Sequence, residues 1–232
     1  MPGALKTGLP CPSCSSSDAF CIYENNDYCF SCHTSFNNKT NKGFMPKKPT
    51  FSGKLPDNVS DEFSKEAIGW LGAYGIKASY ALECGLPYYK GRNAIIIPFI
   101  SDKRLVGYQI RYIASNSRVK SHNIGSLRPY YITPHKEKSI VIVEDMRSGL
   151  KVSKTYNTLS LLGTHLKPCD RNYILENYDT IYLWLDGDDA GMNAANKLYD
   201  QFRLAGNPKI IYTKYDPKTY TEKEIRDLID KA

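Results

Sequence analysis

The chain has 232 residues, of which 41% are hydrophobic and 24% charged, with a formal net charge of +7. These values are typical of a globular protein, and the length allows one ordinary domain with one or two small ones. No run of 18 or more apolar residues is present, which argues against a membrane-spanning helix. The first residues, MPGALKTGLPCPSC, lack the apolar core of a signal peptide. We therefore expect a cytoplasmic protein with no membrane partner, in which disulfides are rare.

The N-terminal cysteines form two Cys-x-x-Cys pairs, CPSC and CFSC, with fourteen residues between the inner cysteines. This is the spacing of a structural zinc site, in which each tight turn directs two thiolates at one ion. A redox dithiol explains one such pair well and two poorly. Cys21 and His33 are spare candidates, with Cys21 on a strand of the module. Cys84 and Cys169 stand alone and are expected to be small buried hydrophobes.

Residues 37–56 are polar and basic, contain Gly and Pro and show no periodicity, which predicts a flexible linker after a zinc module at 1–36. A helix is expected from Ser60, its N-cap, and a second over 77–84. Strands are expected over 93–100 and 104–113. In the second, alternation places Tyr108, Ile110 and Tyr112 on one face and Gln109 and Arg111 on the other.

The region from Lys90 to His122 is strongly basic, with seven Lys and Arg residues against Asp102. The chain from Glu137 onwards is nearly neutral, with 15 acidic and 14 basic residues. A basic region beside an acidic cluster suits a polyanion held against bound cations. The alternative is a solvated basic face.

Strands and helices alternate after Ser139. Strands are expected over 139–144, 157–162, 180–186 and 209–213, and helices over 145–155, 170–177, 189–205 and 221–231. This order predicts an α/β fold with a mostly parallel sheet flanked by helices on both faces. Functional groups of such a sheet gather beyond the carboxyl ends of its strands.

Acidic residues stand at two of these strand ends. Asp186 and Asp188 follow an apolar strand and point the same way in an extended segment, because they are two residues apart. Gly187 adds no bulk and Gly191 lets the backbone turn into the helix. Glu144, which ends another strand, completes a set of hard oxygen ligands suited to Mg²⁺ and phosphoryl or nucleotidyl chemistry. The alternative is that Asp189 is an N-cap and the other two aspartates are loop residues. An acidic strand end also occurs in receiver domains, which carry no zinc module.

The pair VIVEDMRSGLKVSK and WLDGDDAGMNAA resembles the two motifs of a Toprim domain. With the four-cysteine module, linker and basic region before it, nearly the whole chain resembles bacterial-type (DnaG-like) primases, most closely the primase half of bacteriophage primase-helicases. The resemblance implies a zinc-ribbon template-binding domain at 1–36, a basic α+β subdomain of the RNA polymerase core at 57–136 and a Toprim catalytic domain at 137–232.

The same resemblance assigns residue roles. It implies zinc ligands Cys11, Cys14, Cys29 and Cys32, and catalytic Mg²⁺- or Mn²⁺-binding residues Glu144, Asp186 and Asp188, with Asp216 as a weaker acidic match. It implies that nucleotide and template are handled by Arg111, Arg118 and Lys120, and that the ribbon reads the template through Glu24, Asn26 and Tyr28. The implied enzyme is a DNA-directed RNA primase that makes short RNA primers from ribonucleoside triphosphates on single-stranded DNA during replication.

Two departures from the family pattern stand out. The usual motif is Glu-Gly-x-x-Asp, whereas this chain has Glu144, Asp145 and Ser148 at the corresponding places, which indicates either a working variant or reduced activity; we favour the working variant. The chain also has no Gly-x-x-x-x-Gly-Lys-Ser/Thr loop. We therefore expect a separate replicative helicase as partner, or a standalone or excised primase, acting in the cytoplasm of a bacterial host if phage-encoded.

Two other functions remain open. A recombination mediator also combines a four-cysteine zinc motif with a small Toprim domain, but places a helical hairpin before the zinc motif, where this chain has ten residues. A Toprim nuclease shares the metal chemistry. A topoisomerase needs a tyrosine nucleophile on a further large domain, for which there is no room.

Overall fold

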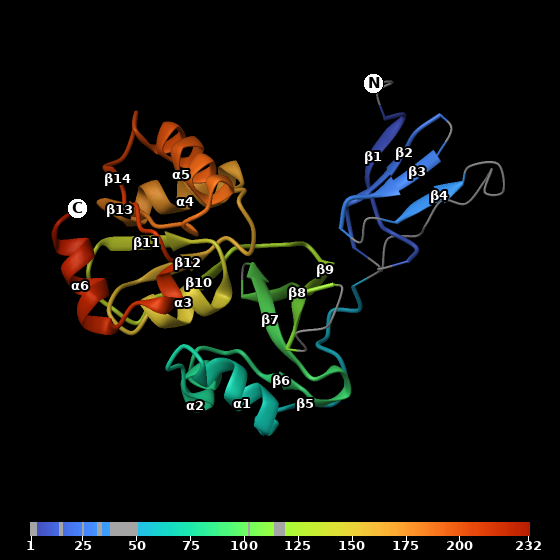
Figure 1. Cartoon of the computed structure of the whole chain (residues 1–232), viewed down its shortest axis with the longest axis horizontal. Coiled ribbons are helices and arrows are strands. Elements are labelled where there is room, and N and C mark those ends of the chain that lie inside the picture. The colour runs from blue at the N-terminus through green and yellow to red at the C-terminus, as the bar shows by residue number, and fades with distance from the viewer. Residues whose placement is uncertain are drawn as a thin grey trace. The chain divides into compact units, whose positions relative to one another are not determined.

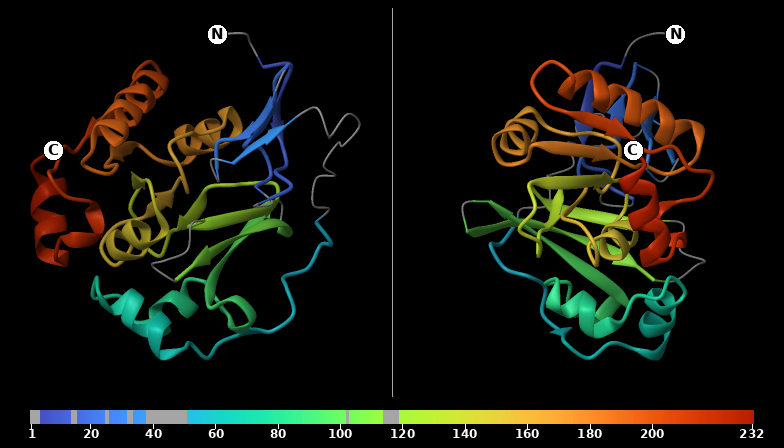
Figure 2. Two further views of the ribbon diagram at one scale, coloured as in Figure 1. Left: turned by 45° about the vertical axis from the view of Figure 1, so that its right-hand side comes forward. Right: turned by 90° about the vertical axis from the view of Figure 1, so that its left-hand side faces the viewer.

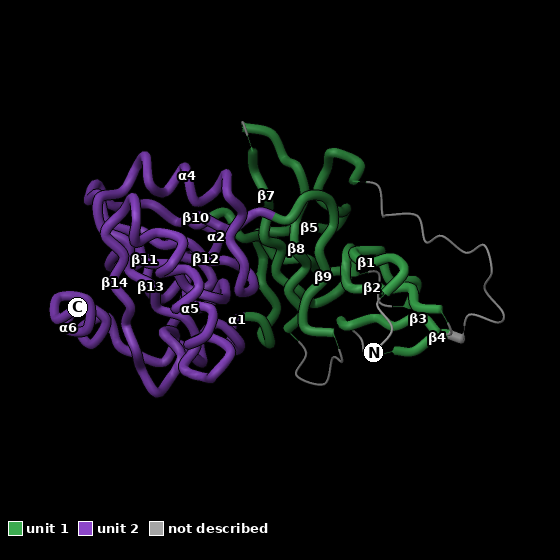
Figure 3. The backbone as a smooth tube through the Cα atoms, turned by 90° about the horizontal axis from the view of Figure 1, so that it is seen from above, with its two compact units in different colours: residues 1–67, 85–127 green, residues 68–84, 128–232 purple. Residues whose placement is uncertain are grey.

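The computed structural model of the protein forms two compact units, coloured separately in Figure 3. Unit 1 comprises residues 1–67 and 85–127, and unit 2 comprises residues 68–84 and 128–232. The structure describes residues 4–13, 16–24, 26–31, 34–37, 51–101, 103–113 and 119–232. Each unit is therefore built from segments that are not contiguous in the sequence.

The N-terminal part of unit 1 is a small antiparallel sheet, blue in Figure 1. Its strands follow chain order: β1 (Lys6–Leu9), β2 (Phe20–Ile22), β3 (Asn26–Cys29) and β4 (Ser35–Asn37). The core is small: Cys11, Phe20 and Cys29 are buried together, and the rings of Phe20 and Phe36 meet edge to face at 5.2 Å. Cys21 lies on β2, as predicted. The described residues of this module bury only a few apolar side chains, which leaves little apolar burial to stabilise it.

The second sheet of unit 1 is also antiparallel. It has the order β5 (Val59–Ser60), β6 (Tyr88–Tyr89), β7 (Ala94–Ser101), β8 (Arg104–Tyr112) and β9 (Ser121–Gly125). The long strands β7 and β8 confirm the two predicted strands. Tyr108 and Ile110 pack in one cluster, as their alternation predicts, whereas Gln109 on the other face is buried and donates to Asn123 Oδ1 at 2.9 Å.

Residues at the end of the expected linker belong to this sheet's core. Phe51 and Leu55 pack against the cluster around Tyr108. Residues 38–50, the greater part of the expected linker, lie outside the described residues.

The first helix begins later than predicted. Ser60 ends β5, and α1 (Lys65–Gly72) is capped by Ser64, whose Oγ accepts from the Ala67 N–H at 3.1 Å. Ser60 instead accepts from the Glu62 N–H at 3.0 Å in a local turn. Both serines satisfy a backbone donor, but only Ser64 directly precedes the helical apolar positions. The second predicted helix is confirmed as α2 (Ala78–Glu83).

Unit 2 contains the predicted mostly parallel sheet. Its order is β10 (Tyr130–Ile132), β12 (Thr158–Ser160), β11 (Ser139–Val143), β13 (Thr180–Leu183) and β14 (Pro208–Ile210). Four of these strands are parallel, and β10, which the sequence did not predict, is an antiparallel edge strand on β12.

Helices cover both faces of this sheet, as Figures 1 and 2 show. Alternate residues of β11 separate the two cores: Ile140 and Ile142 pack on one side, and Val141 and Val143 on the other. The first face is covered by α4 (Pro168–Asn177) and α5 (Asp189–Phe202), and the second by α3 (Met146–Val152) and α6 (Glu222–Asp230). The predicted helices are thereby confirmed, with ends that shift by a few residues.

The two isolated cysteines are less buried than expected. Cys169 is exposed and Cys84 is only partly buried. Cys169 is the second residue of α4, where its thiol accepts from Arg128 at 3.2 Å instead of entering the core. No helix among the described residues is long and apolar enough to cross a membrane.

The turn from β13 into α5 requires glycine at position 191. A Cβ added to Gly191 would overlap the backbone carbonyl of Asp186. We expect Gly191→Ala to lower the free energy of unfolding by about 1 to 3 kcal/mol, because backbone atoms have to shift. Urea unfolding followed by tryptophan fluorescence measures this in unit 2, which holds both tryptophans, Trp70 and Trp184.

A matched control is Gly69→Ala in α1, where an added Cβ meets nothing within 4 Å. Alanine there is expected to stabilise the helix by about 0.5 to 1 kcal/mol. Equal stability changes for the two substitutions would contradict the close backbone approach at position 191.

Candidate functional site

Adjacent parallel strands bring the predicted carboxylates to one edge of the sheet. Glu144 directly follows β11, and Asp186 follows β13 by three residues. The strands pair in parallel up to Ile142 and Leu183, and the Trp184 N–H then donates to the Ile142 carbonyl at 2.9 Å. The carboxyl ends of both strands therefore meet at one place, where ligands of such sheets bind.

Asp188 is fixed by the helix that follows it. It is the N-cap of α5, and its Oδ1 accepts from the Gly191 N–H at 2.8 Å. The alternative prediction, with Asp189 as the cap, is wrong, because Asp189 is the first residue of the helix itself. Gly187 is needed for close packing, since an added Cβ would lie 2.5 Å from the Thr213 carbonyl. The Asp-x-Asp segment is thus held between α5 and the chain after β14.

Burial and the repulsion between like charges raise the pKa values of the carboxyl groups at this edge. The pKa of Glu144 is raised to about 7, first by burial and then by the charges of Asp186, Asp188 and their acidic neighbours. Burial also raises the pKa of Asp186 to about 6, although the nearby Lys218 ammonium opposes the rise. Carboxylates that are both half-buried and mutually repelling are favourable places for a cation.

The donor set fits a hard divalent cation. Asp186 Oδ1 is buried and has no hydrogen-bond partner among the described residues, which leaves a lone pair unused. Mg²⁺ needs only one or two protein carboxylates, since water and substrate phosphates fill its other positions. In the part of the chain that the structure describes, no three His, Cys, Asp or Glu side chains form a group that could hold a metal ion. A metal ion bound at this edge would therefore share its coordination shell with water and substrate.

A buried lysine, which sequence reasoning missed, stands beside these carboxylates. Lys218, on the short 3-10 helix η2 (Pro217–Thr219), is only 6% exposed. Its Nζ donates to Asp145 Oδ2 at 2.7 Å and to Asp216 Oδ2 at 2.5 Å. Although burial opposes it, the two carboxylates raise the pKa of Lys218. The signal in the sequence is the Asp-Pro-Lys run, in which the lysine follows Asp216 by two residues.

Asp145 occupies one of the two motif positions that differ from the family pattern, and Ser148 occupies the other. It is the N-cap of α3, and its Oδ1 accepts from the N–H groups of Arg147 and Ser148. Ser148 Oγ also donates to Asp145 Oδ2 at 3.1 Å. Burial raises the pKa of Asp145, but Lys218 and the Ser148 N–H outweigh it and hold the pKa below its usual value. Asp145 is therefore a fixed anion that begins a helix.

Arg147 is held by two aromatic rings of the segment 68–84. Its guanidinium carbon lies 4.2 Å from the ring centre of Trp70 and 4.6 Å from that of Tyr74. Lys151 of the same helix donates to the Tyr74 carbonyl at 3.0 Å. These contacts attach residues 68–84 to α3, so the acidic edge begins on a firmly packed helix.

Two of the three described cysteines of the N-terminal module are brought together. Cys11 and Cys29 are buried in one cluster. Each begins a tight turn, closed by hydrogen bonds from the Cys11 N–H to the Ser16 carbonyl and from the Cys29 N–H to the Thr34 carbonyl. Cys14, Cys32 and His33 lie outside the described residues. Two buried thiols at the starts of two turns fit a zinc ion held by paired Cys-x-x-Cys turns.

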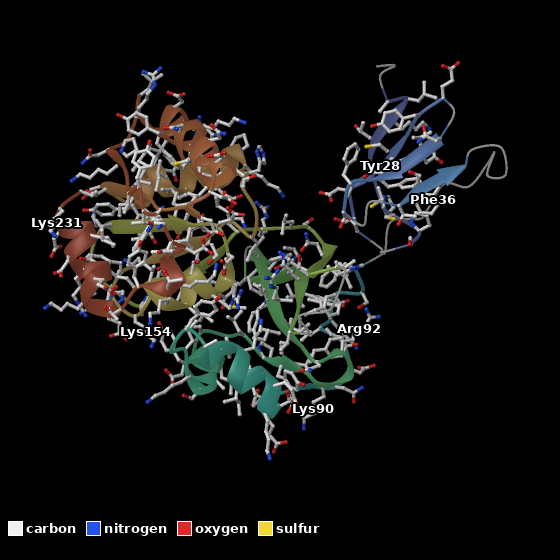
Figure 4. All side chains as sticks on the ribbon, viewed as in Figure 1. Tyr28, Phe36, Lys90, Arg92, Lys154 and Lys231 are labelled. Carbon is white, nitrogen blue, oxygen red and sulfur yellow. The ribbon has the colours of Figure 1, made fainter. Side chains whose placement is uncertain are left out.

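The predicted template residues of this module lie on one hairpin. Glu24 and Asn26 are exposed at the turn between β2 and β3, which the Tyr23 N–H closes by donating to the Asn26 carbonyl. Tyr28 is on β3, and its ring meets Phe30 edge to face at 4.9 Å; Figure 4 labels Tyr28 and Phe36. The hairpin thus carries all three residues, with Tyr28 further from the turn.

The basic residues gather at one end of the second sheet of unit 1. Arg111 on β8 is paired in register with Ser121, and Lys120 directly precedes that residue. Arg92, labelled in Figure 4 and not predicted, donates to the Tyr112 hydroxyl at 3.0 Å at the same end. Arg118 lies outside the described residues. A cluster of Arg and Lys on adjacent strands is suited to binding phosphates.

Comparisons with known proteins identify similar folds. The family model described as Toprim-like matches residues 143–222. The chain resembles a Toprim-type primase. The likeness inferred from the two acidic motifs is thereby confirmed. Among curated proteins, none matches the sequence.

Three solved primase structures share the fold. The Aquifex aeolicus primase, with its zinc-binding and RNA polymerase domains, is similar over 99% of this chain and 80% of that one, with a TM-score of 0.60 and 18% identity. The primase fragment of the bacteriophage T7 primase-helicase is similar over 95% of this chain and 98% of that one, with a TM-score of 0.55 and 17% identity. The DnaG primase catalytic domain bound to single-stranded DNA is similar over 72% of each chain, with a TM-score of 0.58 and 12% identity. At these identities the primase likeness is one of fold.

The raised pKa of Glu144 predicts a pH-dependent stability. Between about pH 4.5 and pH 7, Glu144 keeps its proton in the folded chain but is ionised in the unfolded chain. The free energy of unfolding therefore falls as the pH rises through this range. In the absence of Mg²⁺, Glu144→Gln should match the wild type near pH 4.5 and become more stable above pH 7. After allowance for solvent screening, we expect a gain of about 1 to 2 kcal/mol.

Urea unfolding followed by tryptophan fluorescence, repeated across this pH range, measures the difference. Glu176→Gln, on the exposed side of α4, is the control and should follow the wild type throughout. A stability difference between Glu144→Gln and wild type that does not change with pH would contradict the raised pKa.

Proposed function

We propose that the chain is a DNA-directed RNA primase that joins ribonucleoside triphosphates into short primers on single-stranded DNA. The observation that supports the proposal is the edge where β11 and β13 end: Glu144 there is within electrostatic reach of Asp186 and Asp188, and Asp186 has a buried acceptor without a partner among the described residues. The likeness of fold to primases over nearly the whole chain supports it. A sheet edge of this kind can hold nucleotide phosphates through divalent ions.

Each group of residues has a role under this proposal. Glu144, Asp186 and Asp188 hold Mg²⁺ or Mn²⁺, which when bound supplies charge neutralisation and lowers the pKa of a coordinated hydroxyl. Asp188 is held in place by its cap on α5, so the chain positions the site without a side-chain nucleophile. Arg111, Arg118 and Lys120 hold phosphates of template and nucleotide.

The N-terminal module is proposed to bind one zinc ion through Cys11, Cys14, Cys29 and Cys32 and to read the template through Glu24, Asn26 and Tyr28. Single-stranded DNA as template is supported by the DnaG domain structure that contains it. A separate replicative helicase is proposed as partner, because the similar T7 fragment comes from a primase-helicase. As part of the same proposal, the chain acts in the cytoplasm, of a bacterial host if it is phage-encoded.

Primer synthesis tests the proposal directly. Purified protein is mixed with labelled ribonucleotides, Mg²⁺ or Mn²⁺ and a pool of single-stranded templates of random sequence, with and without a replicative helicase. We expect short RNA products from the wild type and a loss of at least about 100-fold for Asp188→Asn, since even the loss of an outer-shell partner costs about 10- to 100-fold. Asparagine caps a helix as well as aspartate, so the fold is kept.

The control is Asp200→Asn on the exposed side of the same helix, which should leave synthesis unchanged. Cleavage of DNA without synthesis would favour a Toprim nuclease. Tight DNA binding with neither reaction, even with helicase present, would favour a recombination mediator. Wild-type synthesis by Asp188→Asn would show that the metal assignment is wrong.

Zinc content tests the N-terminal module. We expect one zinc per wild-type chain by elemental analysis, and loss of that zinc in Cys29→Ser, because a structural site rarely tolerates the loss of a thiolate. Cys169→Ser is the matched control, since this thiol is exposed on α4 of unit 2. Equal zinc in the Cys29→Ser chain and the wild type would exclude Cys29 as a ligand.

A further inference from the structure

The carboxylate of Asp145 has no capacity left for a metal ion. A carboxylate accepts about four hydrogen bonds, two on each oxygen. The backbone N–H groups of Arg147 and Ser148 occupy Oδ1 at 2.7 and 3.2 Å. Ser148 Oγ and Lys218 Nζ occupy Oδ2 at 3.1 and 2.7 Å. The carboxylate that directly follows Glu144 is thus satisfied entirely by protein donors.

Asp216 is bound to the same ammonium. Its Oδ2 accepts from Lys218 Nζ at 2.5 Å, and its backbone carbonyl accepts from the Thr219 N–H and hydroxyl at 3.0 and 2.8 Å. Asp216 and Lys218 therefore lie on one short, internally bonded turn. The ammonium joins this turn to the start of α3.

This ammonium lies within a cluster of carboxylates. Five carboxylates, those of Glu144, Asp145, Asp186, Asp188 and Asp216, act on one another electrostatically. Lys218 is 6% exposed and bridges two of them, with Asp186 also within its electrostatic reach. A desolvated lysine is costly unless it is paired with carboxylates in this way.

We propose that Lys218 is a built-in cation that takes the place of one divalent ion at this edge. It engages Asp145 and Asp216, and so confines metal binding to Glu144, Asp186 and Asp188. This inference rests on the proposed function only in taking the edge to be a metal site. Beyond that, we infer that Lys218 limits how many divalent ions the five carboxylates bind.

Replacing Lys218 by methionine tests the inference, because methionine is of similar length and uncharged. Removal of the ammonium exposes an oxygen of Asp145 and one of Asp216 to solvent ions. Titration of zinc-loaded protein with Mn²⁺, followed by the electron paramagnetic resonance signal of free Mn²⁺, counts the bound ions. We expect Lys218→Met to bind one ion more per chain than the wild type.

Lys223→Met on the exposed surface of α6 is the matched control and should bind the wild-type number. Tryptophan fluorescence verifies that each variant is folded in unit 2. If folded Lys218→Met binds the same number of ions as the wild type, the inference is overturned. If the wild type itself binds no Mn²⁺, both the inference and the metal site of the proposed function fail.

Asp216→Asn provides a second test that does not depend on the folding of the lysine variant. Because Asp216 is assigned to the lysine and not to a metal, this variant should keep the wild-type number of Mn²⁺ ions. Asp188→Asn, in contrast, should lose an ion. Loss of an ion in Asp216→Asn would show that this carboxylate is a metal ligand and would overturn the inference.

Discussion

Mutual repulsion of carboxylates at the carboxyl edge of one sheet is the constraint on which the rest of unit 2 depends. A parallel pair of strands necessarily ends on one side, so residues that follow β11 and β13 meet whether or not their charges favour it. Burial increases the repulsion, as the raised pKa values of Glu144 and Asp186 show. The fold tolerates this arrangement because cations and backbone donors are placed around it.

Three different devices reduce the repulsion. Helix N-termini accept Asp145 and Asp188 as caps, which places each carboxylate at the positive end of a helix. Lys218 neutralises part of the cluster from within the protein. Glu144 and Asp186 cap no helix and form no ion pair with Lys218 among the described residues. Together with Asp188 they form the part of the edge proposed to hold an exchangeable ion.

The sequence predicted the order of strands and helices in unit 2 because apolar runs there change period sharply from two to 3.6. It also placed Glu144 correctly at the end of β11, whereas Asp186 lies three residues beyond β13 and Asp188 is the N-cap of α5. It missed β10, because a strand of three residues is too short to show an alternation of apolar and polar side chains. It also placed the first helix cap at Ser60, whereas the cap is Ser64. Lys218 was missed for a different reason. A lysine near a charged turn is normally solvated, and only the tertiary packing of η2 against α3 buries it.

The two parts of unit 2 are separated in the chain by residues 85–127, and this has a consequence for synthesis on the ribosome. Trp70 and Tyr74 leave the ribosome long before Arg147, the side chain that they hold. Until α3 has been made, these rings lack their native partner, and the intervening residues must be closed into a loop before the contact forms. The early helices therefore lack this partner while strands β6 to β9 of unit 1 are translated, so the docking of residues 68–84 onto α3 is a late step of folding during synthesis.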